Sequence, residues 1–197
     1  PVVHPSHFGT GELTGPVFAQ LVPSSPAYRQ QVTQTLLVWL IHQARHRVVI
    51  TTPYFVPDEP FLAALRTAVE RGVDVRLVVS KHSNQLLTNL AQKSYYTELL
   101  EAGVKVYLYR PRFLHAKHVL FDERTAFVGS SNIDIRSFAL NAEASLLLHD
   151  PEIARQLHAL NERHLENSDR LTAEDWARRP LLTRVSQNVA RLADSLL

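Results

Sequence analysis

The sequence predicts an α/β fold, an α/β/α sandwich in which helices cover both faces of a mixed β-sheet. Residues 47–52 and 73–79 are short apolar runs rich in β-branched side chains, which is typical of buried strands. Residues 60–70 lie between them with helical periodicity, so the three segments predict a strand–helix–strand unit with parallel strands. The hydrophobic fraction of 45% and the charged fraction of 20% are those of an ordinary globular protein.

The first helices are predicted from the spacing of apolar residues and from the residues at their ends. Asp58 is a suitable N-cap for the helix at 60–70, and Gly72 ends it. A later helix over residues 91–102 ends at Gly103. Another helix, over 28–45, is predicted because its apolar side chains recur every three or four positions: Val32, Leu36, Leu37, Leu40, Ile41 and Ala44.

The rest of the chain alternates between strands and helices before it becomes helical. Strands are predicted at 104–109, 125–128 and 142–148, and helices at 151–167, 172–177 and 180–197. We therefore expect three parts: an inter-lobe linker or arm over 1–26 that is rich in proline and holds a short edge strand at 16–23, a catalytic lobe over 27–170, and a helical tail over 171–197.

Composition limits the chemistry that the chain can perform. It has no cysteine, which excludes a disulfide framework and a cysteine nucleophile, and its sequence shows no cluster of metal ligands, so we expect neither a metal nor another cofactor. A net charge of +2 is too small to predict nucleic-acid binding. No apolar run is long enough to span a bilayer. The chain lacks methionine and starts at Pro1, so we expect a piece of a longer protein.

The stretch from His115 to Asp122 carries the candidate chemistry. The stretch is predicted to be a strand, in which His115 and Lys117 lie two residues apart, on the same face, with Cα atoms about 6–7 Å from each other. An imidazole and an ammonium at that separation can act on one phosphate group. His118 and Asp122 are an odd number of residues away from His115, so their side chains should point to the other face. Asp122 is therefore predicted to have a structural role, and His118 is expected to be a packing or surface residue.

A second group of small and polar residues follows the strand at 125–128. Gly129 ends that strand, at a position where the backbone can approach a ligand closely. Ser130 and Asn132, again two residues apart, can offer a hydroxyl and an amide N–H to phosphate oxygens. The alternative for both residues is that they only form the turn after Gly129 and bind no phosphate.

The pattern H-x-K-x-x-x-x-D followed by G-S-S-N resembles the HKD motif of the phospholipase D superfamily. Four further segments resemble the C-terminal half of the bacterial cardiolipin synthases: residues 51–57, 71–75, 98–107 and 132–137. Family members of that type carry two HKD motifs in one chain, and this sequence shows one. The resemblance implies a phospholipase D-like lobe and implies that the first motif lies on another lobe.

The resemblance also implies a role for each candidate residue. One HKD histidine forms a phosphohistidine, and the other serves as general acid and base, which is the role assigned to His115. Lys117 and Asn132 hold the non-bridging oxygens, and Ser130 assists them. Glu143 is expected to hydrogen-bond the histidine and set its tautomer, although a solvent-facing glutamate is an almost equal alternative.

The function implied is phosphatidyl transfer between two phosphatidylglycerol molecules with release of glycerol, at a bacterial membrane whose spanning segments lie outside this chain. The partners expected are the phospholipid, the membrane surface, and either the first HKD lobe or a second copy of this chain. Two alternatives stay open: a single-motif phosphodiesterase or nuclease that is active as a homodimer, and a catalytically inert lobe.

Two other features carry weaker hypotheses. Tyr54 and Phe55 follow a strand end and can line an acyl or headgroup pocket, although core packing is the commoner fate of such aromatics. The helix at 180–197 has an apolar stripe with arginines around it, which suits either an anionic membrane surface or packing against the lobe.

Overall fold

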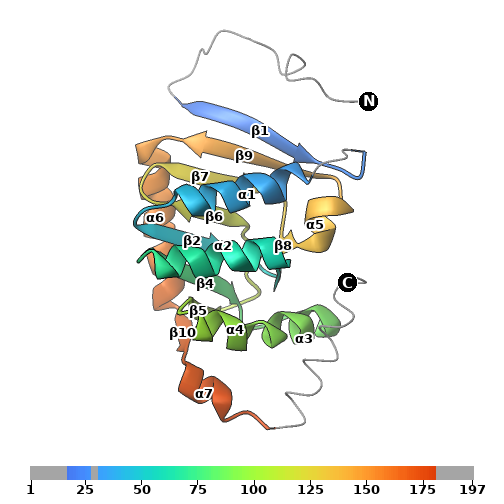
Figure 1. Cartoon of the computed structure of the whole chain (residues 1–197), viewed down its shortest axis with the longest axis vertical. Helices are drawn as coiled ribbons and strands as arrows, with labels where there is room; N and C mark the ends of the chain where they lie inside the picture. The colour runs from blue at the N-terminus through green and yellow to red at the C-terminus, as the bar shows by residue number, and fades with distance from the viewer. Residues whose placement is uncertain (1–16, 28–30, 181–197) are drawn as a thin grey trace.

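The computed structural model describes residues 17–27 and 31–180. Their main feature is an eight-stranded sheet with the order β1-β9-β7-β6-β2-β4-β5-β10, beside a two-stranded sheet of β3 and β8 (Figure 1). The strands are β1 (Phe18–Ser24), β2 (Arg47–Thr51), β3 (Phe55–Val56), β4 (Asp74–Ser80), β5 (Lys105–Tyr109), β6 (His118–Phe121), β7 (Thr125–Gly129), β8 (Ile133–Asp134), β9 (Glu143–His149) and β10 (Ser168–Leu171).

Helices lie on both faces of the large sheet. One face carries α1 (Val32–Gln43), α2 (Glu59–Glu70), α3 (Leu86–Ser94), α4 (Tyr96–Glu101) and α5 (Ile135–Ala139), and the other carries α6 (Pro151–Glu166), as Figure 1 shows. The short α7 (Ala173–Ala177) follows the last strand. Because β2, β4 and β5 pair in parallel and the other neighbours pair antiparallel, the predicted α/β/α sandwich with a mixed sheet is confirmed.

The main core lies between the large sheet and the helices of the first face. Its largest fully buried side chains include Phe55, Phe61, Leu65 and Leu77. A smaller cluster under α6 packs Ala154 and Leu157 against the opposite face of the sheet. Burial on both faces explains why the central strands read as continuous apolar runs in the sequence.

The predicted ends of the second helix are confirmed. The Asp58 side chain accepts a hydrogen bond from the Phe61 backbone N–H at 3.1 Å, as an N-cap does. Gly72 follows the helix at a φ of +86°, a conformation that glycine adopts without the steric cost of a Cβ atom.

Several predicted boundaries were wrong. The helix predicted over 91–102 is two helices, α3 and α4, joined at Tyr95, and α3 already begins at Leu86. Residues 168–171, predicted to lie outside any strand, form the edge strand β10. The edge strand predicted at 16–23 is present as β1, at residues 18–24. It pairs with β9 over its whole length, so this part of the predicted arm belongs to the sheet.

The start of the predicted tail packs against the lobe. The Trp176 ring of α7 lies 5.3 Å from the Tyr96 ring, and the Arg179 guanidinium lies 4.2 Å above Trp176. The helix predicted over 180–197 falls almost entirely outside the described residues. No helix within residues 17–27 and 31–180 is both long enough and apolar enough to cross a bilayer.

Candidate active site

The structure brings His115 and Lys117 together in an extended segment that leads into β6. The segment was predicted as part of the strand, but the strand itself begins at His118, so His115 lies outside the sheet and is exposed. The Lys117 Nζ lies 3.1 Å from His115 Nε2 and donates to the His115 carbonyl oxygen, also at 3.1 Å. The side chains therefore share one face, as their spacing predicts.

The contact places the Lys117 amine within hydrogen-bond distance of the imidazole ring of His115. Burial lowers the pKa of Lys117, while the nearby charges of Glu143 and Asp134 raise it. The two side chains therefore lie where one phosphate group can contact both.

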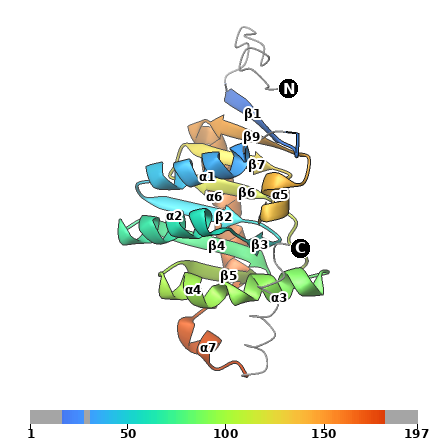
Figure 2. The same ribbon diagram turned by 45° about the vertical axis from the view of Figure 1, so that its right-hand side comes forward.

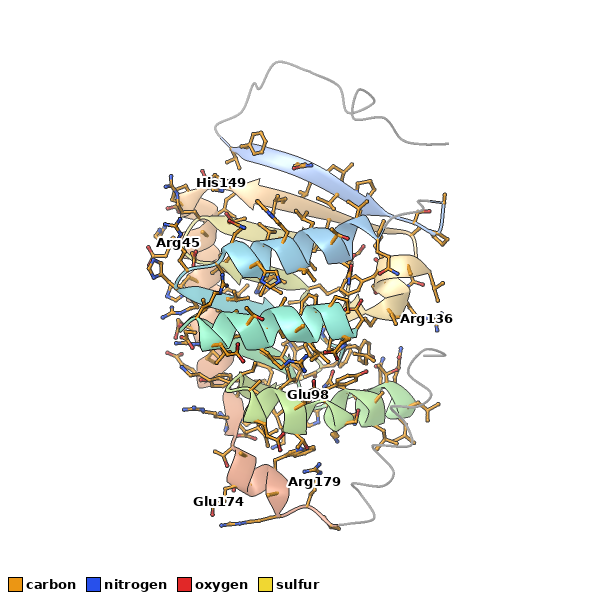
Figure 3. All side chains as sticks on the ribbon, viewed as in Figure 1. Arg45, Glu98, Arg136, His149, Glu174 and Arg179 are labelled. Atoms are coloured by element: carbon orange, nitrogen blue, oxygen red, sulfur yellow. The ribbon has the colours of Figure 1, made fainter. Side chains whose placement is uncertain are left out.

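Asp122 lies at the opposite end of β6, where it organises a turn. Its carboxylate accepts hydrogen bonds from the backbone N–H groups of Arg45, His46 and Arg47, the closest being 2.8 Å from His46. These bonds hold the pKa of Asp122 below its usual range, against the effect of burial. Figure 3 shows Arg45 at the end of the sheet opposite to Arg136. Asp122 therefore fixes the start of β2 against the end of β6.

Gly129 is required by packing against β9. A Cβ atom at this position would lie 2.1 Å from Ser145 Oγ and 2.5 Å from Ser145 Cα. Gly129 was predicted to let the backbone approach a ligand, but its close neighbour in the structure is the paired residue of the next strand. The Gly129 N–H also donates to the Lys117 carbonyl at 3.2 Å, which ties the end of β7 to the His115 segment.

Ser130 is engaged with the backbone of β9. Its hydroxyl accepts from the Ala144 N–H at 3.0 Å and donates to the Ala144 carbonyl at 3.3 Å. The Ser130 hydroxyl therefore bonds the backbone of β9 both as donor and as acceptor, as expected for the turn alternative. Contact between this hydroxyl and a phosphate stays a prediction.

Asn132 and Glu143 flank the site from neighbouring segments. Asn132 is half-buried, and its Oδ1 atom is buried without a hydrogen-bond partner among the described residues. Glu143 starts β9, and its carboxylate accepts from Asn141 Nδ2 at 3.4 Å. Its charge acts on Lys117, as described above. The proposed hydrogen bond from His115 to Glu143 stays a prediction.

A pocket of about 250 Å³ opens beside Asn132. Its other walls are Tyr54, Val56, Gln85, Thr88, Asp134, Ile135, Arg136 and Asn141. Phe113 connects this pocket to the motif, because its ring lies 5.9 Å from Tyr54 and 5.7 Å from His115. Tyr54 thus lines a pocket, whereas Phe55 is fully buried in the core.

His118 belongs to a buried polar group on the other face of the sheet. Its Nε2 lies 2.8 Å from the Asn161 Oδ1 of α6, and Thr51 donates to the same oxygen at 3.2 Å. Burial lowers the pKa of His118. The structure therefore agrees with a packing role for this histidine. Among the described residues, no group of three or more His, Asp or Glu side chains is arranged to hold a metal ion.

Comparisons with known proteins identify the family of this chain. The family model described as "Cardiolipin synthase, PLD-like domain" matches residues 37–165. Cardiolipin synthase A of Pseudomonas aeruginosa is 43% identical over 178 residues, which are 90% of this chain and 36% of the relative. Cardiolipin synthase A of Proteus mirabilis is 36% identical over 90% of this chain and 37% of its own length. The chain spans little more than a third of these relatives.

Solved structures with the same fold are more distant in sequence. The phosphatidylserine synthase of Haemophilus influenzae superposes with a TM-score of 0.71 at 19% identity, covering 91% of this chain and 47% of that one. Nuc of Salmonella typhimurium, a phospholipase D family member, gives 0.67 at 19% identity, covering 79% of this chain and 99% of that one. These structures show the fold, and the matched family model shows that the chain belongs to the phospholipase D-like domain family of the cardiolipin synthases.

Proposed function

We propose that this chain is the second catalytic lobe of a cardiolipin-synthase-like phosphatidyltransferase. The substrate would be phosphatidylglycerol, and the reaction would pass its phosphatidyl group to a second phosphatidylglycerol with release of glycerol. The observation that carries the proposal is the contact of His115 with Lys117, within a motif whose relatives are named cardiolipin synthase. The fold alone would not distinguish lipid from nucleic-acid phosphodiesters.

The reaction consists of two displacements at phosphorus. A histidine of the first motif attacks the phosphorus of the donor, so that a P–N bond forms and the P–O bond to glycerol breaks. His115, protonated for this step, gives its proton to the leaving glycerol oxygen. His115 then takes the proton from a hydroxyl of the second phosphatidylglycerol, whose oxygen attacks phosphorus while the P–N bond breaks.

Lys117 and Asn132 would stabilise the negative charge on the non-bridging oxygens. The Lys117 ammonium already lies on the same side of the segment as the reacting imidazole, so one phosphate can contact both. Partial burial of Lys117 strengthens its attraction to an anion, because less water screens the charge. Asn132 would add amide N–H donors beside it.

A single histidine cannot serve as both nucleophile and leaving-group acid in this scheme. We infer that the active site is completed by a lobe with the first HKD motif, consistent with the small share of the relatives that this chain covers. We also propose that the lobe works at the surface of a bacterial membrane, where its lipid substrate lies.

The test is phosphatidyl transfer by an assembly of this chain with a first-motif lobe, supplied with phosphatidylglycerol in mixed micelles. Cardiolipin and glycerol should form in equal amounts, and His115→Ala should reduce their formation by at least about 100-fold, as loss of a general acid and base does. His42→Ala removes an exposed histidine of α1 and is the matched control. Equal rates for the His115 and His42 variants would refute the proposal.

A homodimeric phosphodiesterase or nuclease is the second candidate. A lobe of this fold covers nearly the whole Nuc chain, so one lobe is the size of a complete protein of this family. In that case the chain alone would cleave phosphodiesters as a dimer, with paired His115 residues across a two-fold axis.

A further inference from the structure

The pocket beside Asn132 is built by three segments that are distant in sequence, at residues 54–56, 85–88 and 132–141. The short sheet of β3 and β8 forms its floor, through Val56 and Asp134, which are partners in that sheet. Gln85 and Thr88 contribute the start of α3, and Arg136 contributes α5. Figure 2 shows the start of α3 and α5 on either side of β3, and Figure 3 shows Arg136 at this end of the molecule.

The polar residues of the lining decide which chemical group fits the pocket. Amide and hydroxyl side chains both donate and accept hydrogen bonds, and Gln85, Thr88 and Asn141 supply them to the lining. Asp134 adds an acceptor and Arg136 adds donors. Groups that must both donate and accept, namely alcohols, match such a lining best.

Other parts of a phospholipid match the pocket less well. An acyl chain would need an apolar lining, and only Val56, Ile135 and the Tyr54 ring offer one. A second phosphate would face the Asp134 carboxyl, and a quaternary ammonium would face the Arg136 guanidinium. Burial raises the pKa of Asp134, against hydrogen bonds from Ser137 and Asn132 that lower it. Ionisation of this carboxyl is therefore less favourable than in water.

The pocket is also placed to receive a group attached to the reacting phosphate. Asn132 lines the pocket and belongs to the proposed phosphate site, and the Phe113 ring lies between Tyr54 of the pocket and His115. The buried Oδ1 atom of Asn132 has no partner among the described residues, which is costly unless another group approaches.

We propose that this pocket binds the polyol end of the lipid headgroup, the glycerol of phosphatidylglycerol, through Gln85, Thr88, Asp134, Arg136 and Asn141. The inference rests on the proposed function for the identity of the lipid. It assigns selection of the headgroup to residues outside the HKD motif. Thr88 is the clearest probe, since its hydroxyl already donates to Gln85 Oε1 at 2.9 Å and can accept from a substrate alcohol.

The first test compares two donor lipids in the assembled enzyme: phosphatidylglycerol, and phosphatidylethanol, whose headgroup lacks free hydroxyls. Thr88→Val keeps the side-chain shape and removes the hydroxyl, and Asn141→Leu removes an amide at similar size. Each should lower the ratio of kcat/KM for phosphatidylglycerol over phosphatidylethanol by about 3- to 10-fold, the value of one hydrogen bond. Thr35→Val, at an exposed position of α1, is the matched control and should leave the ratio at the wild-type value.

The second test needs no catalysis. Deacylated headgroup, glycerophosphoglycerol, is titrated into the protein while the side-chain amide NMR signals of Gln85 and Asn141 are followed. Shifts of these signals that Thr88→Val weakens would support the pocket even if the enzyme transferred no lipid, in which case the proposed function alone would fail. A normal transfer reaction with an unchanged lipid ratio in both variants, or no shift of the amide signals, would overturn the pocket assignment.

Discussion

His115 and Lys117 show how much of a site can follow from two positions in an extended chain. Their side chains meet because alternate residues of such a chain point the same way, whether or not the segment pairs in a sheet. The contact places the lysine amine beside the imidazole that is proposed as general acid and base. Arrival of a phosphate would give the ammonium an anionic partner and leave the imidazole free to exchange its proton.

The proposed general-acid role of His115 can be separated from a nucleophilic role by changing the leaving group. A phosphatidyl ester of p-nitrophenol expels a weakly basic phenolate that needs no proton, whereas glycerol leaves as a strongly basic alkoxide. We expect His115→Ala to reduce phosphoenzyme formation from phosphatidylglycerol by about 100-fold or more, and formation from the nitrophenyl ester far less. The rate is measured in a single turnover by release of each alcohol.

Equal losses with the two leaving groups would contradict the acid role of His115. They would indicate instead that His115 attacks phosphorus, because a nucleophile is needed whatever group leaves. Lys117→Met should slow both esters alike, since charge on the non-bridging oxygens develops with either one, and it is the comparison variant.

Asp122 carries a different prediction at the residue scale, one of stability. Asp122→Ala leaves three backbone N–H groups without their acceptor and places an alanine at a φ of +50°. We expect the free energy of unfolding to fall by about 2–4 kcal/mol, measured by urea denaturation. Asp122→Asn keeps one acceptor oxygen and tolerates positive φ, so it should lose clearly less. Losses of the same size in the two variants would contradict this account.

At the scale of elements, α6 is held to the back of the sheet by a buried polar group as well as by apolar contacts. His118 of β6 bonds Asn161 of α6, and the His164 ring lies 6.4 Å from the His118 ring. Burial lowers the pKa of both histidines, His118 being the more deeply buried. Packing of the helix therefore favours the neutral form of both imidazoles.

The depressed pKa of His118 makes stability depend on pH in a definite direction. In the unfolded chain the imidazole takes up a proton near its ordinary pKa of about 6.5, while in the folded chain it resists. Stability from this residue is therefore complete above about pH 6.5 and is lost as the pH falls below it, by at most about 1.4 kcal/mol per pH unit. The check is urea unfolding at pH 7.5 and at pH 5.5.

The matched variant is His118→Gln, which keeps a donor for Asn161 but cannot take up a proton in this range. Its loss of stability between the two pH values should be smaller than that of the wild type, while the exposed His42→Gln should match the wild type. An identical pH dependence in the His118 variant would show that this buried histidine does not control the packing of α6.

Elements also show where sequence patterns succeed and fail. The cap at Asp58 and the end at Gly72 were predictable because each depends on a few neighbouring residues. The strand β10 was missed because the segment Ser-Asp-Arg-Leu has no apolar alternation and pairs only at the sheet edge with β5. The reason for Gly129 was missed because its close neighbour, Ser145, is set by the pairing of β7 with β9.

The candidate site divides in the same way. The proximity of His115 and Lys117 was predictable from their spacing in an extended chain. Their roles, and that of Asn132, stay predictions. Thr88 and Arg136 carried no signal, because they approach each other only when α3 and α5 pack around the sheet of β3 and β8. Residues that are brought together only by tertiary packing cannot be identified from the periodicity of apolar residues in the sequence.

At the scale of the whole molecule, the lobe contains one HKD motif, whereas the proposed two-step transfer requires two catalytic histidines. The chain covers 47% of the phosphatidylserine synthase with which it shares its fold, and little more than a third of its cardiolipin synthase relatives. Its His115 segment is exposed, as it must be if a second lobe supplies the opposing nucleophile. The account therefore predicts that catalysis is a property of an assembly.

The most direct test is to measure cardiolipin formation from phosphatidylglycerol by this chain at a known molar mass, alone and during titration with a first-motif lobe. The account predicts no transfer by the chain alone and a rate that rises to a plateau at one lobe per chain, with His115→Ala inactive throughout. Transfer by the chain alone, as a monomer or as a dimer, at the rate of the complete assembly would contradict the claim that it supplies half of a two-lobe active site.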